Sequence, residues 1–238
     1  MTTRLKLALP DDTSALAGVF AARQQRSRRI RDALVTAGVT LLNERSLAQL
    51  KVPDIAGQAG CSVGSFYTRF ADKDAFFRAL QYAYIHAAHT EIAERTQPHV
   101  LHGLSAAAVI EQFVTLMLDL FGGQSRGVLR ETLLRIAEPE NPWEPMREMG
   151  RQVRTELHRA MADRIPGPTL TARQNRLSFY FQTIVGVLHN DLVNDHHVFK
   201  SRDQTLAPAL VELGERYLKV RGPNHRSPGS LKARGSTQ

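Results

Sequence analysis

Hydroxyl-bearing and basic side chains gather between residues 62 and 73 of this 238-residue chain. The hydroxyls of Ser65 and Thr68 can contact bases or phosphate oxygens, and Tyr67 can pack on a sugar–phosphate edge and donate to a phosphate. The Arg69 side chain can also reach the major groove of the duplex. Lys73 adds positive charge at a helix start, where exposed backbone N–H groups already favour a phosphate. These residue types predict contacts with duplex DNA rather than catalysis.

Two short helical patterns, joined by a glycine turn, must position these side chains. Gly60 can adopt the positive φ that ends the first helix, and Ser62 can cap the second. Asp72 can cap a longer helix that follows at once. Residues at helical spacing form the expected buried faces: Ile55, Ala56 and Ala59 on the first helix, and Val63, Phe66 and Phe70 on the second. This order is typical of a helix-turn-helix, and a plain helical hairpin within a larger bundle is the alternative.

The rest of the chain has helical periodicity and no alternating strand pattern. Pro and Gly breakers separate the expected helices, at about residues 26–43, 52–59, 62–70, 73–95, 104–121, 126–137, 143–165, 170–195 and 204–220. We therefore expect an all-α protein of about nine helices. Its parts would be a flexible N-terminal arm (1–22), a three-helix helix-turn-helix DNA-binding domain (23–75), a helical bundle (76–221) and a disordered basic tail (222–238).

The charge of the chain favours an anionic partner. It carries 31 Lys and Arg against 23 Asp and Glu, a formal net charge of +8. The basic residues concentrate between Arg23 and Lys73 and again after Arg216. Solvated arginines on helix faces are the alternative explanation of this excess.

The sequence gives little support to catalytic, metal or membrane functions. A single cysteine, Cys61, excludes an intramolecular disulfide and a cysteine metal cage. Histidine pairs at 86/89, 99/102 and 196/197 have no third and fourth ligand arranged with them, so we predict no metal site. No Gly-x-Ser-x-Gly elbow or phosphate-binding loop occurs, although composition leaves a Ser-His-Asp triad open. Without a signal peptide or membrane-spanning run, we expect a cytoplasmic protein that is not an enzyme, has no cofactor and binds no membrane.

The segment from about residue 28 to residue 80 resembles the DNA-binding domain of the tetracycline-repressor (TetR) family of bacterial transcriptional regulators. The matching residues are Asp54-Ile55-Ala56, Ala59-Gly60-Cys61-Ser62, Gly64-Ser65-Phe66-Tyr67, Phe70 and Lys73. The resemblance implies a recognition helix at about Ser62–Phe70, with the usual DNA contacts at Val63, Gly64, Ser65, Tyr67, Arg69 and Lys73. Our full set of expected DNA-binding residues is Lys51, Ser62, Val63, Gly64, Ser65, Tyr67, Thr68, Arg69 and Lys73.

One position departs from the family pattern. Lys51 stands where the family usually has a Thr or Ser that caps the second helix. We therefore expect a weaker cap, with Lys51 free to contact a phosphate instead. Pro53, in the first turn of this helix, partly compensates because its φ is already helical.

The resemblance also implies that the C-terminal bundle dimerises and binds a small molecule. The last two long helices are the usual dimer surface, and their apolar stripes suit a four-helix interface across a two-fold axis. The expected interface residues are Leu177, Phe181, Ile184, Leu188, Leu206, Leu210, Leu213 and Tyr217. Core packing within one subunit is the alternative.

Aromatic, methionine and histidine side chains of the same bundle are suited to line an apolar ligand cavity. The candidates are Phe113, Met117, Phe121, Trp143, Met146, Tyr180 and His189, with plain core packing as the alternative. Arg147, Arg151 and Arg154 form a basic face that can meet an anionic ligand or simply face solvent.

These observations predict a ligand-responsive repressor that binds a palindromic operator as a homodimer. Its partners would be duplex DNA, a second copy of itself and an unidentified small-molecule effector. Two alternatives stand beside this hypothesis. One is a helical ligand-binding or enzymatic bundle whose helix-turn-helix no longer binds DNA. The other is a regulator that responds to a partner protein, which a filled core in the C-terminal bundle would favour.

Overall fold

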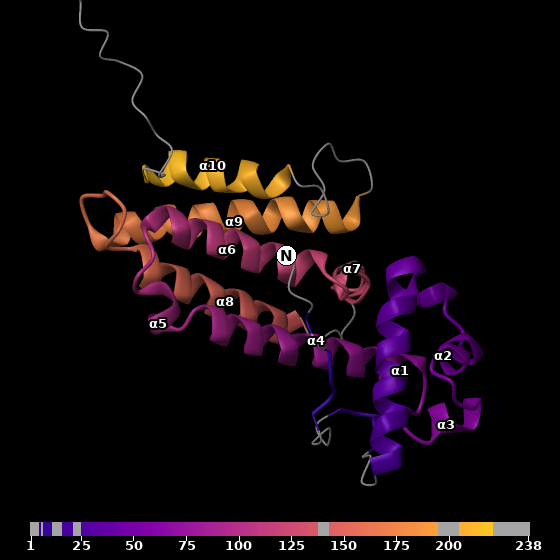
Figure 1. The fold of residues 1–238 in the computed structure, drawn as a ribbon. Coiled ribbons are helices and arrows are strands. Elements are labelled where there is room, and N and C mark those ends of the chain that lie inside the picture. The colour runs from indigo at the N-terminus through magenta and orange to yellow at the C-terminus, as the bar shows by residue number, and fades with distance from the viewer. Residues whose placement is uncertain are drawn as a thin grey trace, which may run out of the picture.

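The computed structural model describes Leu5 and residues 7–10, 16–20, 25–137, 143–194 and 205–220, with only the backbone of Trp143. These residues form ten α-helices and one short 3-10 helix, which confirms the all-α expectation. The helix beyond the nine expected is α5, a single turn at Pro98–Leu101. Figure 1 shows α1, α2 and α3 at one end of the molecule and the other helices in a bundle, with α4 extending from that end into the bundle.

The DNA-binding unit begins with α1 (Gln25–Glu44) and the 3-10 turn η1 (Leu47–Gln49). Helix α2 (Val52–Gln58) has Pro53 in its first turn, and the side chain of its N-cap, Lys51, makes no capping hydrogen bond, as the sequence predicts. Gly60 has a φ of +66° and turns the chain. In α3 (Val63–Tyr67) the Ser62 hydroxyl accepts from the Ser65 backbone N–H at 3.2 Å. The helix ends three residues before the expected Phe70.

An aromatic cluster fixes α3 on the following helix, α4 (Lys73–Arg95). Phe66, Phe70 and Phe76 are fully buried, and their ring centroids lie 5.0 to 5.4 Å apart. The Asp72 carboxylate caps α4 by accepting from the Ala75 N–H at 2.6 Å. The expected core role of Phe66 and Phe70 is confirmed, and this cluster holds the recognition helix to the start of α4.

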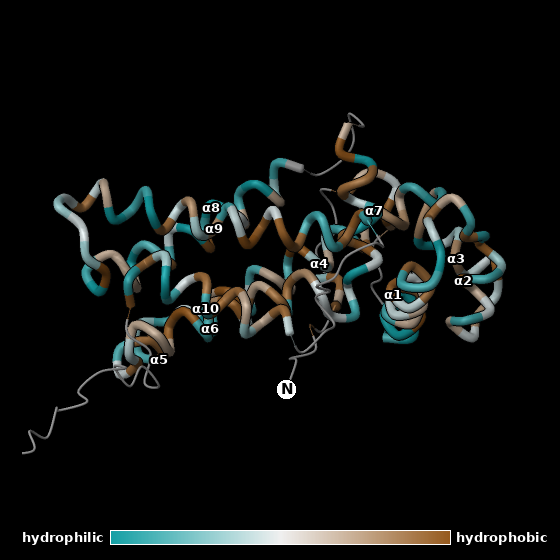
Figure 2. The backbone as a smooth tube through the Cα atoms, turned by 90° about the horizontal axis from the view of Figure 1, so that it is seen from above, coloured by the Kyte–Doolittle hydropathy of each residue, from teal (hydrophilic) through white to brown (hydrophobic). Residues whose placement is uncertain are grey.

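The C-terminal bundle contains α6 (Ala106–Gly122), α7 (Arg126–Leu134), α8 (Trp143–Met161), α9 (Leu170–Val193) and α10 (Leu206–Leu218). Helix α6 is central, in contact with α8, α9 and α10, and much of its surface is buried. Helix α7 contacts both α9 and α1, and so lies between the bundle and the DNA-binding unit. Figure 2, viewed from above, shows that unit at one end of an elongated body, with hydrophilic and hydrophobic residues alternating along the helices.

Two ion pairs, each with a buried carboxylate and a partly buried arginine, link helices of the bundle. Arg126 of α7 donates to the Asp191 carboxylate of α9 at 2.7 Å and to its backbone carbonyl at 2.6 Å. Arg95 of α4 donates to the buried Asp119 carboxylate of α6 at 2.6 Å. These pairs give each carboxylate a charged hydrogen-bond donor where water is excluded.

The described part of the N-terminal segment is packed rather than loose. Leu5, Leu9 and Val19 are buried, and Arg31 donates to the Leu9 carbonyl at 3.1 Å. Residues 16–20 run beside the turn between α3 and α4, where Phe20 N–H donates to the Arg69 carbonyl at 2.8 Å. At these positions the segment differs from the flexible arm expected at 1–22, because its leucines are buried in the hydrophobic core. The expected basic tail at 222–238 lies outside the described residues.

Over the described parts of the chain, no one helix has both the length and the apolar character needed to cross a bilayer. The bent pair Ala106–Gly122 and Arg126–Leu134 passes that test together, by length and composition only.

Candidate nucleic-acid interface and ligand cavity

Helix α3 presents an accessible face at the end of the molecule. Val63 and Tyr67 are 39 % and 51 % exposed, although both are large apolar or aromatic residues. Ser62, Gly64 and Thr68 are exposed as well, and Ser65 is half-buried. A Cβ added at Gly64 would approach nothing in the chain more closely than 3.8 Å, so the packing of the chain does not require glycine there. The missing side chain instead leaves the α3 backbone open to a second molecule.

The hydroxyls of α3 are partly engaged within the helix. Ser62 and Ser65 share a hydrogen bond between their Oγ atoms at 3.0 Å. Thr68 Oγ1 donates to the Ser65 carbonyl at 2.9 Å. The Thr68 hydroxyl also accepts from the Arg69 guanidinium at 2.7 Å, so its single proton is used by the Ser65 carbonyl. Of Ser62 and Ser65, the hydroxyl that accepts in their shared bond can still donate its own proton to a phosphate or a base edge.

Arg69 does not point outward with its neighbours, and the structure corrects that expectation. Its side chain is 8 % exposed, and its guanidinium donates to the Ser27 carbonyl at 3.2 Å, the Ser27 hydroxyl at 3.1 Å and the Ser65 carbonyl at 2.7 Å. Arg69 therefore fastens the end of α3 to the start of α1. An arginine adopts this role because its rigid fork of donors satisfies several carbonyls at once.

Lys73 also has a structural contact that the sequence does not reveal. Its Nζ donates to the carbonyls of Leu47 and Leu50 at 2.9 and 3.2 Å, so it ties the η1 turn to the start of α4. Lys51 is exposed beside α2. DNA contacts by either lysine remain predictions.

The contact between Arg69 and Ser27 brings further basic residues to this end of the molecule. Arg26 and Arg29, at the start of α1, are exposed. Both residues contribute to the excess of positive charge in the sequence. Helical periodicity alone gives no reason to predict that they contact DNA. The hydrogen bonds from Arg69 to Ser27 place the start of α1 near the end of the recognition helix.

A cavity of about 190 Å³ lies in the C-terminal bundle between α4, α6, α7, α8 and α9. Of the seven residues expected to line a ligand site, Met117, Phe121, Met146 and His189 line this cavity. Burial lowers the pKa of His189, whose ring packs on Phe121 with centroids 5.3 Å apart. Phe181, expected at the dimer interface, lines the cavity instead, and so do Tyr84 and Leu129, which sequence analysis missed.

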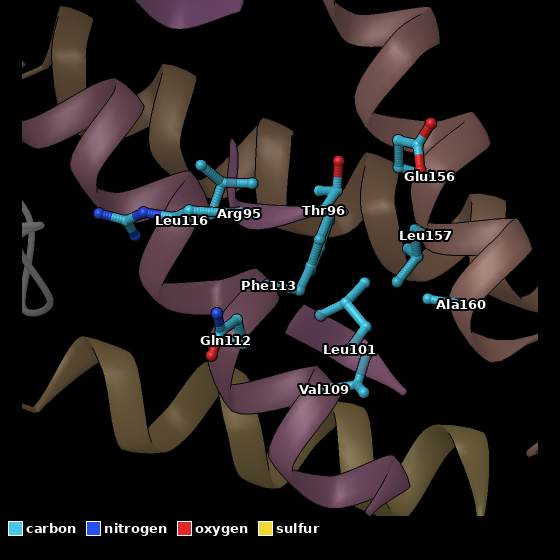
Figure 3. A pocket seen from close by; sticks show the side chains of 10 residues that line it. All are labelled: Arg95, Thr96, Leu101, Val109, Gln112, Phe113, Leu116, Glu156, Leu157 and Ala160. Atoms are coloured by element: carbon cyan, nitrogen blue, oxygen red, sulfur yellow. The ribbon is translucent and has the colours of Figure 1, made fainter. Parts of the chain in front are cut away.

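The other expected lining residues lie elsewhere. Phe113 borders a separate pocket of about 20 Å³, where Figure 3 shows Leu101, Val109 and Leu157 nearby. Tyr180 is buried, and its hydroxyl donates to the Leu210 carbonyl at 2.9 Å. The Trp143 side chain lies outside the described residues.

Apart from Phe181, which lines the cavity, the expected dimer residues divide into two groups. Five of the eight are buried within one subunit, because this stripe of α9 and α10 packs into the core with α6: Leu177, Ile184, Leu188, Leu206 and Leu210. The structure therefore corrects their assignment to an interface. Leu213 and Tyr217 do face outward, at 40 % and 36 % exposure, and Phe179, which was not among the expected residues, is 59 % exposed.

Of the basic face expected on α8, Arg147 lies at the cavity and pairs with Glu144 at 3.6 Å. Arg151 of the basic face on α8 pairs with Glu144 at 2.7 Å and Glu148 at 2.6 Å, as a solvated face does. His89 hydrogen-bonds to Gln152 at 2.6 Å. Among the described residues no group of three His, Cys, Asp or Glu side chains is placed to hold a metal ion. His196 and His197 fall outside them.

The α2 helix, the Gly60 turn and the exposed α3 have the arrangement of a helix-turn-helix domain. Residues 34–80 match the sequence profile of the family described as bacterial regulatory proteins, tetR family. The match covers the helix-turn-helix segment, so this part of the chain is similar to the DNA-binding domain of that family.

Solved structures support the fold over most of the chain. A TetR-family regulator from Mesorhizobium loti superposes with a TM-score of 0.60 at 14 % identity, over 82 % of this chain and 96 % of that one. NalD, the secondary repressor of the MexAB-OprM multidrug efflux pump in Pseudomonas aeruginosa, gives 0.56 at 17 %, over 82 % and 98 %. FadR from Bacillus subtilis in complex with stearoyl-CoA gives 0.52 at 17 %, over 80 % and 98 %. A comparison with curated sequences finds no match.

Proposed function

We propose that this protein is a ligand-responsive repressor that binds a palindromic operator as a homodimer. The observation that carries the proposal is the accessible face of α3. Ser62, Val63, Gly64, Tyr67 and Thr68 stand exposed on a helix held by a fully buried aromatic cluster. A short helix with a rigid base and an open face fits a major groove, in the way that helix-turn-helix proteins read DNA.

Within this helix we assign different roles to different residues. Tyr67 and Lys51 would contact phosphates and so position the protein on any duplex. Val63 is apolar and exposed, which suits contact with a thymine methyl group, and Ser65 would donate to or accept from a base edge. Arg26 and Arg29 would add phosphate contacts from the start of α1. Arg69 would act indirectly, by holding α1 and α3 together.

A second copy would pack on the outer face of α9 and α10. Phe179 and Tyr217 are in contact there, with ring centroids 5.5 Å apart and ring planes tilted by 44°, and Leu213 lies exposed on α10. A Cβ at Gly186, on the outer side of α9, would meet no atom within 4 Å, so a partner helix could approach closely. A two-fold axis through this face would present two copies of α3 to half-sites about 34 Å apart, one helical turn of DNA.

The cavity supports an effector that is a small molecule rather than a protein. A filled core would have favoured the protein partner, and about 190 Å³ of open space argues against it. The structure of the similar FadR contains stearoyl-CoA, and the similar NalD is described as a repressor. By analogy, we expect small-molecule control and repression here.

Helix α7 would transmit the effect of a bound effector from the cavity to the DNA-binding unit. Leu129 of this helix lines the cavity, and its neighbours contact the end of α1 in the DNA-binding unit. An effector that pushes α7 would tilt α1 and change the separation of the two recognition helices. Operator affinity would fall because only one separation fits both half-sites.

Selection of bound sequences from a random duplex library, with purified protein at near-physiological salt, tests this proposal. We expect an enriched palindrome whose binding weakens steeply with added salt. Absence of enrichment, from a folded and dimeric protein that also fails to bind non-specific duplex at low salt, would overturn DNA binding. The alternative of a helical bundle with another activity would then be preferred.

A further inference from the structure

The cavity in the C-terminal bundle has a chemistry that restricts what it can hold. We propose that it binds a neutral, mainly apolar molecule about the size of one substituted benzene ring, such as an alkylphenol. The inference rests on the proposed function only in treating this molecule as the effector, because binding itself depends on the cavity alone.

The volume sets the size of the ligand. The cavity measures about 190 Å³. An apolar cavity of about 150 Å³ is enough to take up benzene. A ring with one or two short substituents therefore fits without opening the bundle, whereas a long acyl chain would need the helices to separate.

The lining is almost wholly apolar, and its shape is adaptable. Met117, Met146 and Met149 contribute flexible, polarizable thioethers from α6 and α8. Phe121 and Phe181 add aromatic surface from α6 and α9. Thioethers and rings make favourable contacts with an aromatic ligand and can adjust to its substituents.

The charges of the site argue against an ionised ligand. Among the described lining residues Arg147 is the one whose side chain carries a permanent charge. It is 61 % exposed and lies 3.6 Å from the Glu144 carboxylate, so its charge faces solvent and has a partner. His189 is kept neutral because burial lowers its pKa. An anion in this interior would lose its hydration without gaining a buried counter-charge.

One polar substituent on the ligand can still be accommodated. Tyr84 and His189 supply the polar side chains of the inner lining. The Tyr84 hydroxyl donates to the Leu120 carbonyl at 3.1 Å, and a hydroxyl oxygen that donates can also accept. A phenolic or alcoholic hydroxyl on the ligand would match such an acceptor.

Gly150 provides a direct way to fill the site. It lines the cavity on α8, and a Cβ added there would meet no atom within 4 Å. The Cβ of a leucine at this position therefore has room, and the rest of its side chain would compete with the ligand for the cavity. A helical glycine replaced by leucine also gains helix propensity, so the variant is expected to fold.

Calorimetry with three matched probes tests the proposal in the absence of DNA. Ethylbenzene and 4-ethylphenol are neutral, and 4-ethylbenzoate has similar size but carries a negative charge. We expect the neutral probes to bind, and 4-ethylphenol to raise Tm by about 5 °C at 100 times its Kd. We expect 4-ethylbenzoate to bind at least about tenfold more weakly.

Variants at Gly150 and Arg147 test whether the probes bind in this cavity. Gly150→Leu should weaken 4-ethylphenol about tenfold or more, whereas Gly150→Ala should leave most of the affinity. Arg147→Gln should not change the preference for the neutral probes over 4-ethylbenzoate, because the Arg147 charge faces solvent. Tight binding of 4-ethylbenzoate that Arg147→Gln abolishes would overturn the proposal, as would unchanged binding by Gly150→Leu or no binding of either neutral probe.

The outcome separates this inference from the proposed function. A protein that selects a palindrome but binds neither neutral probe is still a regulator, with a different effector. A protein that binds the neutral probes but no duplex keeps its ligand site and loses the proposed function.

Discussion

The backbones of Gly127 and Leu42 lie so close that no side chain fits between them. A Cβ at residue 127 would collide with the Leu42 carbonyl and would lie 2.6 Å from the backbone nitrogen of Asn43. The Gly127 N–H donates to the Asn43 side-chain carbonyl at 2.8 Å, and Asn43 Nδ2 donates to the Gln124 carbonyl at 2.5 Å. This contact joins α7 of the bundle to the end of α1 in the DNA-binding unit.

We expect Gly127→Ala to destabilise the protein by roughly 1–3 kcal/mol, because the added methyl forces two backbones apart. Unfolding by urea measures the change. Gly150→Ala is the matched control, since that methyl enters open space and an alanine favours the helix by up to about 1 kcal/mol. Equal stability changes in the two variants would contradict the close contact described here.

Arg69→Ala should lower the free energy of unfolding by about 2 kcal/mol, because it removes the charged hydrogen bonds by which a nearly buried guanidinium joins Ser27 to Ser65. Arg69→Lys should recover only part of this loss, because one ammonium cannot reach both Ser27 and Ser65 as the guanidinium does. Thermal denaturation distinguishes the three proteins. A stable Arg69→Ala variant with altered base preference would restore Arg69 to the set of DNA-reading residues.

Tyr67→Phe should weaken binding to every duplex by about tenfold while leaving Tm unchanged, because the exposed hydroxyl would donate to a phosphate. Fluorescence anisotropy with the selected operator and with an unrelated duplex measures both affinities. Ser65→Ala is the comparison, and it should alter preference between sequences. The assignment fails if Tyr67→Phe binds both duplexes as tightly as the wild type.

Leu213→Glu should convert the proposed dimer into monomers, because a charge in the outer face of α9 and α10 would be buried by the partner. Light scattering separates a dimer from one chain of 26.5 kDa. Leu134→Glu is the control, at a residue that is 57 % exposed on α7. Ile184→Ala should instead destabilise each subunit by about 2–5 kcal/mol, because Ile184 is fully buried within it. A dimeric Leu213→Glu variant would exclude this face.

Stability should fall as the pH drops below about 6.5, partly through His189. Burial lowers the pKa of His189 from its usual 6.5, so the unfolded chain binds more protons in this range than the folded chain. The contribution of a neutral His189 is complete above pH 6.5 and is lost as the pH falls toward the lowered value. His189→Leu should flatten this part of the profile of Tm against pH. His158, whose pKa burial also lowers, should retain a slope of its own.

The local elements of the DNA-binding unit could be predicted from the sequence because their causes are local. Ser62 and Asp72 cap the helices that follow them, and Gly60 turns the chain with a positive φ. Each of these features depends on residues within three or four positions along the chain. The spacing of Phe66 and Phe70 likewise indicated a buried face, and both are fully buried.

Only the tertiary structure decided which neighbours each side chain contacts. Periodicity marks an apolar stripe on α9, but it does not say whether α6 or a second subunit covers it, and Ile184 is buried by its own subunit. Arg69 and Ser27 are 42 residues apart in sequence, so no local pattern could predict their hydrogen bonds. The cavity depends on how five helices pack, and one lining residue, Leu129, also belongs to the helix that contacts α1. Long-range packing makes these choices because many apolar arrangements satisfy the same sequence pattern, and only one fills the available space.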